Sequence, residues 1–361
     1  MIAARDRISV TRRTMADSRD QKRYGTGHDD GLEPLTPLDL NQIDSVDDLV
    51  RAMGATAFGG RRLGEAADVL EAMVNDPDCF RVVTISGAMT IAKQGLVLCE
   101  MIEQGWVQAI VATGALMTHG FVEGAGMLHF KHRPNMQDEE LFEKGYNRVY
   151  DTIELEKNLD ETERILREAL VDTPDDEVLC SRTLLDRLGQ YLAENTEGRA
   201  ILKSAVAANV PIYVPAFTDS ELGLDLSIYN HARIRAGKPR LGFDPFLDLD
   251  DFANRVRQHA TLGIFTIGGG VPRNWAQQVA PYLEITSARL GETEAVRRYK
   301  YAVRICPEPE HWGGLSGCSY TEGVSWGKFV PESEGGRFAE VFADATIAWP
   351  LVVRAVMART K

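Results

Sequence analysis

The sequence predicts an α/β protein with a doubly wound, mainly parallel β-sheet. Short apolar runs rich in β-branched residues recur along the chain, and several end in glycine, serine, threonine or aspartate. Charged stretches with apolar residues at helical spacing lie between these runs. Strands of the buried type that alternate with helices are typical of such a sheet. The chain has 361 residues without a short-period repeat, so one domain over residues 34–361 is expected.

The first predicted elements are a helical region and a βαβ unit. Residues 45–76 carry apolar side chains near i+3 and i+4 steps, which predicts helix. The runs 80–87 and 107–114 are short, apolar and β-branched, and the stretch 96–105 between them has a helical pattern. A strand, a helix and a second strand within this length predict one βαβ unit.

The same alternation continues toward the C-terminal end. Further strands are predicted at 210–220, 262–270, 300–309 and 337–346. Further helices are predicted at 159–171, 183–195, 244–260 and 347–361, the last with Pro350 near its first turn. The polar residues 1–33 are expected to form a flexible arm, and an ordered arm that docks on a partner subunit is the alternative.

Composition argues against several classes of function. The net charge of −13 and the pI of about 5.1 exclude nucleic acid as an expected partner, because phosphate binding needs a basic face. No apolar run approaches the ~20 residues that a membrane span needs, and no secretory signal is visible. The scattered cysteines form no CxxC pair, which predicts a reduced, cytoplasmic protein. His129 and His132 lack a carboxylate spaced as in a zinc-protease helix, so no metal site is expected.

Small or hydroxyl residues follow four predicted strands, where ligands of doubly wound sheets bind. They are Ser86 and Gly87, Thr113 and Gly114, Thr218 and Asp219, and Gly268, Gly269 and Gly270. These loops either cradle a nucleotide-like ligand or are tight turns that need glycine for backbone reasons. Asp219 and Asp344 each follow a strand, and either hold ribose hydroxyls or cap the next helix.

No standard nucleotide-binding fingerprint fits this sequence. The G-x-G-x-x-G pattern needs glycine where Arg273 stands, and the Walker pattern fails around Lys328 in "EGVSWGKF". Lys328 is therefore either a surface charge or, flanked by glycine and beside Trp326, a buried amine of lowered pKa that acts as a nucleophile. Glu322 could bind a substrate ammonium group, and His119 is the best candidate for a functional histidine.

The segment "HWGGLSGCSY" at 311–320 is too rich in glycine and serine for a regular element. It is predicted to be a binding loop.

Five ordered motifs resemble the deoxyhypusine synthase family: "PAFTDSELG", "IGGG", "GGLSG", "TEGVSWGKF" and "VFADAT". The resemblance covers roughly residues 45–355 and includes the helix "ATAFGGRRLGEAADVLEAM" and a turn at 145–151. It implies a Rossmann-like α/β fold and a homotetramer built from tight dimers, with active sites at the dimer interface.

The resemblance also implies a chemistry. In the family, NAD accepts a hydride from a polyamine, a lysine captures the resulting imine, and the aminobutyl group passes to an acceptor amine. By match, Lys328 would be that lysine, Trp326 would lie along the aliphatic chain, and Glu322 would hold an ammonium group. The residues implied to line NAD are Ser86, Gly87, Thr113, Gly114, Asp219, Gly268, Gly269, Gly270, Asp344 and Ala345.

The expected substrate site departs from the family pattern. Thr118 and His119 replace paired glutamates, Asn274 replaces a histidine, Leu315 replaces an aspartate, and Leu224 stands where an acid is expected, with Asp225 next to it. The residues expected to contact substrate are His119, Asp225, Asn274, Gly314, Leu315 and Ser316. Loss of ammonium-binding acids argues against unchanged spermidine recognition. The forms "TGALMTH" and "GGLSG" resemble the bacterial deoxyhypusine synthase-like branch.

The sequence therefore favours an NAD-dependent aminoalkyl transferase that acts on a small polyamine, with homospermidine formation as one concrete version. A true deoxyhypusine synthase that modifies a protein lysine is the alternative. A non-catalytic NAD-binding regulatory paralogue is a third possibility, which the presence of Lys328, Glu322 and Trp326 disfavours.

Overall fold

The computed structural model describes residues 19–291, 293 and 295–360 of the chain. The chain divides into two compact units, Met1–Pro37 and Leu38–Lys361. In the described part of the first unit, one short 3₁₀ helix, η1, spans Gln21–Arg23. Much of the predicted arm, residues 1–18, lies outside the described residues.

The larger unit is built on a six-stranded parallel sheet with the strand order β11-β10-β9-β1-β2-β7. The strands are β1 Cys79–Ile85, β2 Ala109–Ala112, β7 Ile212–Tyr213, β9 Thr261–Ile267, β10 Tyr299–Ile305 and β11 Arg337–Val341. From β1 the chain first adds β2 and β7 on one side, and later adds β9, β10 and β11 on the other. The predicted doubly wound α/β fold is thus confirmed, and its strand order reverses between β1 and β9.

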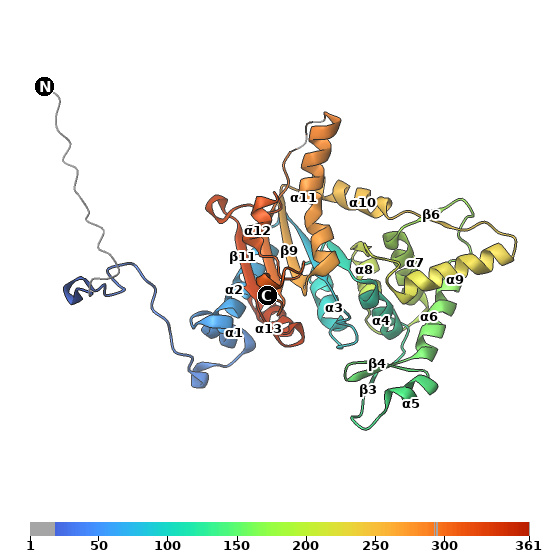
Figure 1. Ribbon diagram of the computed structural model, residues 1–361, viewed down its shortest axis with the longest axis horizontal. Coiled ribbons are helices and arrows are strands. Elements are labelled where there is room, and N and C mark those ends of the chain that lie inside the picture. Colours follow the sequence, from blue (N-terminus) through green and yellow to red (C-terminus); the bar gives the residue numbers. More distant parts are fainter. Residues whose placement is uncertain (1–18, 292, 294, 361) are drawn as a thin grey trace. The chain divides into compact units, whose positions relative to one another are not determined.

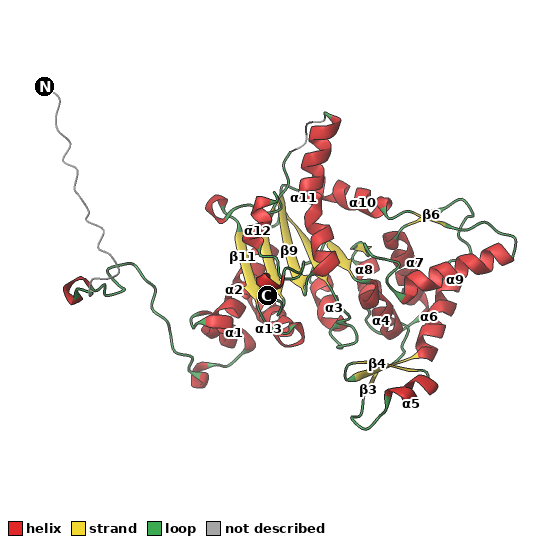
Figure 2. Ribbon diagram, viewed as in Figure 1, coloured by secondary structure: helices red, strands yellow, loops and turns green. Residues whose placement is uncertain are grey.

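Helices cover both faces of this sheet (Figures 1 and 2). Alternate side chains of β1 point to opposite faces, so that Val82 joins one apolar cluster and Val83 the other. The face of Val83 packs against α1 Val46–Gly54, α2 Phe58–Asn75, α3 Gly95–Glu103 and α13 Ala345–Arg359. The face of Val82 packs against α10 Phe246–Arg257, α11 Gly270–Leu290 and α12 Tyr320–Ser325. Among the described helices, none combines the length and the hydrophobicity that a membrane crossing demands.

A long excursion separates β2 from β7. It contains α4 Gly114–Gly124, β3 Phe130–Lys131, α5 Asp138–Glu143, β4 Tyr146–Val149, β5 Thr152–Leu155, α6 Glu156–Ala169, β6 Val178–Leu179, α7 Ser181–Asn195 and α8 Ile201–Ala207. Strands β3, β5 and β4 form a small antiparallel sheet. After β7 come α9 Glu221–Arg235 and β8 Gly242–Phe243, and β8 pairs with β6.

Three local predictions differ from the structure. The strand predicted at 210–220 shortens to β7, because Pro211 and Pro215 flank it and cannot donate to a ladder. The turn expected at 145–151 contains β4, and Pro350 lies in the second turn of α13 rather than near its start. The predicted helices 159–171, 183–195 and 244–260 are present as α6, α7 and α10.

Helices α1 and α2 cross at a pair of glycines. A Cβ atom on Gly64 would lie 2.4 Å from the Cα atom of Gly54 and 2.8 Å from its nitrogen. Backbone atoms cannot rotate away as a side chain can, so this close crossing requires glycine at position 64.

We expect G64A to lower the free energy of unfolding by roughly 1–3 kcal/mol, because the added methyl group forces the two helices apart. The matched control is G59A in the same helix, where a Cβ atom would meet nothing within 4 Å. G59A should raise stability by about 0.5 kcal/mol. Urea unfolding followed by circular dichroism measures both changes, and a G64A variant as stable as the wild type would contradict this account.

Candidate functional site

The residues predicted to line a cofactor lie in a row along the carboxyl edge of the main sheet, after β7, β2, β1 and β9 and, beyond β10, after β11. The Gly269 N–H donates to Ser86 Oγ over 2.8 Å, which joins the ends of β9 and β1. Thr113 Oγ1 donates to the carbonyl oxygen of Gly87 over 2.6 Å, which joins the ends of β2 and β1. The row includes the point where the strand order reverses, which is where doubly wound sheets bind dinucleotides.

Two glycines in this row are required by close packing. Gly268 has a φ of +77°, and a Cβ atom there would lie 2.1 Å from Ser86 Oγ. A Cβ atom on Gly114 would lie 2.3 Å from the Cβ atom of Ser220. The glycine turn after β9 and the start of α4 therefore approach their neighbours more closely than any side chain permits.

The amide groups of the glycine turn already have partners within the chain. Gly269 donates to Ser86 Oγ, and Gly270 donates to Ser316 Oγ over 3.0 Å. From the sequence, this glycine loop either cradles a nucleotide-like ligand or is a tight turn. In the structure, serine hydroxyls stand between these two amides and any ligand.

The two aspartates of the row differ in their roles. The carboxylate of Asp344 caps α13, because Oδ1 accepts from the backbone N–H of Thr346 over 2.7 Å, and Ala345 is the first residue of that helix. At α9 the cap is Ser220, and Asp219 beside it is exposed.

Lys328 lies in a cleft of about 300 Å³ on the α11 and α12 side of the sheet. The cleft is lined by Arg273, Asn274, Gln277, Gln278, Gly313, Gly314, Leu315, Cys318, Glu322, Trp326 and Lys328. Only 8% of Lys328 is exposed, and its Nζ donates to Asn274 Oδ1 over 3.1 Å. The amine is thus buried against an uncharged acceptor.

The environment of Lys328 lowers the pKa of its amine. Burial lowers the pKa of Lys328, and the neighbouring Arg273 guanidinium lowers it further, while the Glu322 carboxylate acts in the opposite direction. The Trp326 ring, which is exposed at the cleft, has its centroid 6.0 Å from Nζ. The sequence left open whether Lys328 is a surface charge or a buried amine. In the structure it is a buried amine.

The backbone around Lys328 explains its placement. The chain leaves α12 through Gly327, whose φ is +70°. The Lys328 N–H donates to the carbonyl oxygen of Gly323 over 3.1 Å, and the Lys328 carbonyl oxygen accepts from the N–H of Tyr299 at the start of β10 over 2.9 Å. Phe329 is buried against the Tyr299 and Tyr320 rings. These contacts anchor both sides of Lys328.

Two buried arginines hold the glycine-rich loop that forms the other wall. Arg273 Nη1 and Nη2 donate to the carbonyl oxygens of Leu315 and Cys318 over 3.1 and 2.6 Å. Arg304 donates to the carbonyl oxygens of Ser316 and Cys318, and pairs with Glu340. The predicted binding loop at 311–320 is therefore fixed at this point. Neither arginine was predicted to have this role, although an arginine inside the apolar run 300–309 is a visible signal in the sequence.

The structure brings most of the predicted catalytic and substrate residues together. Lys328, Glu322, Trp326, Asn274, Gly314 and Leu315 line the cleft, and Ser316 lies in the same loop.

Asp225 lies elsewhere, in α9, where it is buried and its Oδ2 has no hydrogen-bond partner. Burial raises the pKa of Asp225 to about 7, and the carboxylates of Glu163 and Glu221 add to this effect. The neighbouring Leu224 is exposed.

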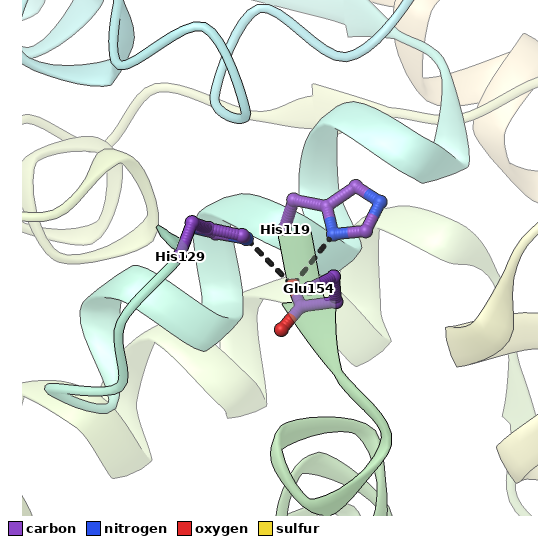
Figure 3. Close-up of side chains that lie close together, drawn as sticks. All are labelled: His119, His129 and Glu154. Atoms are coloured by element: carbon purple, nitrogen blue, oxygen red, sulfur yellow. Dashed lines mark hydrogen bonds and ion pairs between the residues drawn. The ribbon is translucent and has the colours of Figure 1, made fainter. Parts of the chain in front are cut away.

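His119 also lies elsewhere, in a polar cluster beside α4 (Figure 3). Its Nδ1 is 3.0 Å from Glu154 Oε2, and Nε2 of His129 is 2.6 Å from the same oxygen. Burial by itself would raise the pKa of Glu154, but the contacts with the two imidazoles hold it at about 2. Glu154 was missed in the sequence because β5, which carries it, was not predicted.

Comparison with known proteins places this chain in a family. The family model for deoxyhypusine synthase matches residues 48–356. A probable deoxyhypusine synthase 2 of Methanosarcina acetivorans is 33% identical over 329 residues, which cover 91% of this chain and 90% of the relative. A deoxyhypusine synthase-like protein of Chlorobaculum parvum is 31% identical, over 89% of this chain and 88% of its own.

A solved structure agrees at the level of the fold. The crystal structure of a putative deoxyhypusine synthase from Entamoeba histolytica superposes with a TM-score of 0.59 at 16% identity, covering 91% of this chain and 98% of that chain. The match of the family model to most of the sequence and the identity to curated relatives lead to one conclusion: this chain belongs to the deoxyhypusine synthase family.

Proposed function

We propose that the protein is an NAD-dependent aminoalkyl transferase that acts on a small polyamine through an imine with Lys328. The observation that carries this proposal is the position of Lys328. Its amine is buried, bonded to an uncharged amide oxygen, and lowered in pKa within a cleft. A neutral lysine amine is the form that attacks carbonyls and imines.

The carboxyl edge of the sheet fits NAD. Gly268 and Gly270 have φ values of +77° and +58°, and Ser86 and Ser316 bind the turn between them. This small-residue surface lies where the strand order reverses. The residues that would hold NAD are those of the row, from Asp344 and the glycine turn to Thr113 and Asp219. NAD held there would accept a hydride from the carbon next to a substrate nitrogen, and later return it.

Lys328 would carry the group between donor and acceptor. Its amine adds to the carbon of the substrate imine, and the original nitrogen leaves, as ammonia when putrescine is the donor. The same carbon is then joined to Nζ of Lys328 by a C=N bond. An acceptor amine attacks the same carbon, and Lys328 leaves again as a free amine. Asn274 would orient Nζ through the hydrogen bond over 3.1 Å, and Trp326 would cover the aliphatic chain.

The cleft favours a short amine. Glu322 is the carboxylate among its lining residues, while Asn274 and Leu315 are uncharged. One carboxylate matches one remote ammonium group. We therefore propose a diamine such as putrescine as donor, and homospermidine formation from two diamines as the reaction. A protein lysine as acceptor is the second candidate, favoured by the names of the curated relatives.

We further propose that copies of this chain assemble around the cleft, as the homotetramer of the family would require. Trp312, Leu315 and Trp326 expose large apolar side chains at or next to the cleft. Exposed apolar patches of this kind mark association surfaces. A cytoplasmic location is also proposed, since all five cysteines are free thiols and four of them are buried.

K328M should abolish covalent capture of the amine, because methionine fills the same space without a nucleophile. The enzyme is incubated with NAD and putrescine, spermidine or agmatine, and then reduced with borohydride. Intact mass analysis should show one aminoalkyl adduct on the wild type and on K300M, whose lysine is on β10. The absence of any adduct on the wild type, despite bound NAD, would contradict the proposal.

N274D should shift the pH dependence of this capture. The amine attacks only when neutral, which requires a pH above its pKa. A carboxylate at the position of Asn274 Oδ1 stabilises the ammonium form and raises the pKa of Lys328. The pH midpoint of trapping should therefore rise by about one unit or more. N274L, which adds no charge, should leave the midpoint unchanged or lower it, and an unchanged midpoint in N274D would contradict the assigned contact.

Incubation with putrescine and catalytic NAD should separate the two candidate acceptors. Release of homospermidine, measured by chromatography of the amines, is expected if a free diamine is the acceptor. Adduct on Lys328 without any released polyamine would instead favour a protein lysine as acceptor.

A further inference from the structure

Two imidazoles and one carboxylate converge on a buried point outside the Lys328 cleft. His119 comes from α4, His129 from the segment between α4 and β3, and Glu154 from β5. We propose that these three residues bind one divalent transition-metal ion of the zinc or iron(II) class. This inference goes beyond the proposed transferase reaction, and it gives His119 a role other than contact with the amine.

The donor atoms are close enough to share one ion. Glu154 Oε2 lies 3.0 Å from His119 Nδ1 and 2.6 Å from His129 Nε2, and all three atoms lie within 4.8 Å of one another (Figure 3). Donors of a tetrahedral ion at 2.0–2.2 Å are about 3.4 Å apart. The set therefore needs to open by less than about 1 Å at either contact to admit the ion.

The donors are shielded from water. The side chains of His119, His129 and Glu154 are 11%, 0% and 1% exposed. His129 Nε2 is buried and has no hydrogen-bond partner of acceptable geometry, although it lies so close to the carboxylate. A buried ring nitrogen whose contact lacks hydrogen-bond geometry is incompletely satisfied, and an ion on its lone pair would satisfy it.

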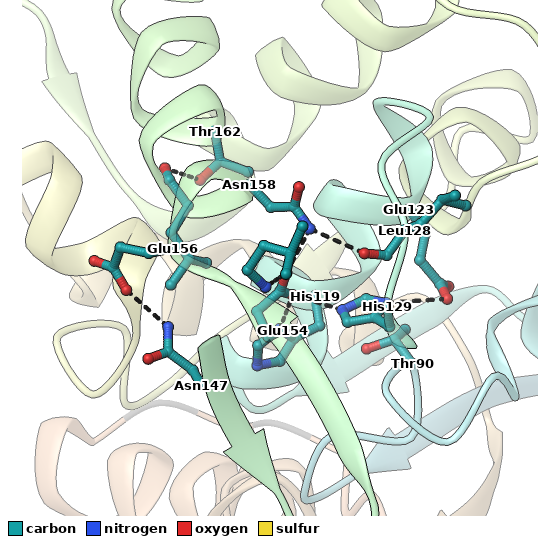
Figure 4. Close-up of polar contacts among 12 residues, drawn as sticks. Thr90, His119, Glu123, Leu128, His129, Asn147, Glu154, Glu156, Asn158 and Thr162 are labelled. Atoms are coloured by element: carbon teal, nitrogen blue, oxygen red, sulfur yellow. Dashed lines mark hydrogen bonds and ion pairs between the residues drawn. The ribbon is translucent and has the colours of Figure 1, made fainter. Parts of the chain in front are cut away.

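Outer contacts orient the carboxylate as they do in metal sites. Glu154 Oε1 accepts from Asn158 Nδ2 over 2.6 Å (Figure 4). The same oxygen accepts from the backbone N–H of Leu155 over 2.9 Å. This leaves Oε2 as the oxygen that faces both imidazoles. Such second contacts fix ligand orientation in proteins that bind metals.

The other ring nitrogen of His129 faces a carboxylate as well. Nδ1 lies 3.7 Å from Glu123 Oε1 and 2.9 Å from Lys93 Nζ, and Lys93 pairs with Glu123 over 2.5 Å. Coordination through Nε2 places the proton on Nδ1, where it can donate to Glu123. Lys93 must then turn away from Nδ1, which its half-exposed side chain allows.

The donor set selects the class of ion. Two imidazoles with one monodentate carboxylate suit zinc or iron(II), whereas calcium and magnesium prefer oxygen ligands. The ion would join α4 to the small sheet of β3, β4 and β5, and its binding free energy would add to the stability of that region.

The test is the metal content of the full chain, purified without a histidine tag from medium that contains zinc, iron and manganese. Mass spectrometry of the elements should find close to one ion per chain, and its identity distinguishes zinc from iron. The metal content of H129A should be at least about tenfold lower than that of the wild type. H132A and K328M should retain it, since neither residue contributes a donor. Wild-type protein with less than roughly a tenth of an ion after saturation with each metal would overturn the proposal.

A second measurement keeps the test decisive if H129A does not fold. Crystals of the wild type are measured at the absorption edge of the bound element. An anomalous difference peak among His119, His129 and Glu154 supports the site, and a peak elsewhere or none overturns it. Because K328M bears on the transferase reaction alone, failure of either idea leaves the other intact.

Discussion

The buried guanidinium groups of Arg273 and Arg304 are the interaction on which the Lys328 site depends. Both donate to backbone carbonyl oxygens of the glycine-rich loop, which has few side chains of its own to pack. The loop is therefore held by arginine contacts instead of by an apolar core. Loss of either arginine would leave buried carbonyl oxygens without donors, which is more costly than loss of a surface pair.

Arg273 also affects the charge of the lysine. Arg273 lies near Lys328 and disfavours a second positive charge there, in addition to the effect of burial. Asn274, one residue along the helix, offers Nζ an oxygen without a negative charge. One turn of α11 thus both positions the opposite wall of the cleft and lowers the pKa of the amine.

Much of this arrangement could be predicted from the sequence. The strands are apolar, β-branched and long enough to show their pattern, and the glycine motifs at their ends are local signals. Lys328 stands out only through its motif, because burial cannot be deduced from one charged residue. Glu154 and its small sheet could not be predicted, since β3 and β4 are exposed and carry no apolar period. Arg273 and Arg304 donate to backbone carbonyl oxygens about 12 to 45 residues away. Such contacts cannot be predicted from residue type, because every residue has a carbonyl oxygen.

The two serines that accept from the glycine turn affect which hydrogen-bond donors lie at the carboxyl edge of the sheet. A hydroxyl group that accepts from an amide still has its own hydrogen to give. The Ser316 hydroxyl, which accepts from Gly270, can therefore donate outward, whereas the Ser86 hydroxyl donates to the carbonyl oxygen of Ile267 over 3.5 Å. A hydroxyl that accepts one hydrogen bond is a stronger donor in a second one, and its hydrogen can rotate about the Cβ–Oγ bond. At Ser316 the edge of the sheet thus offers a donor that can change direction, where a bare glycine turn would offer a fixed one.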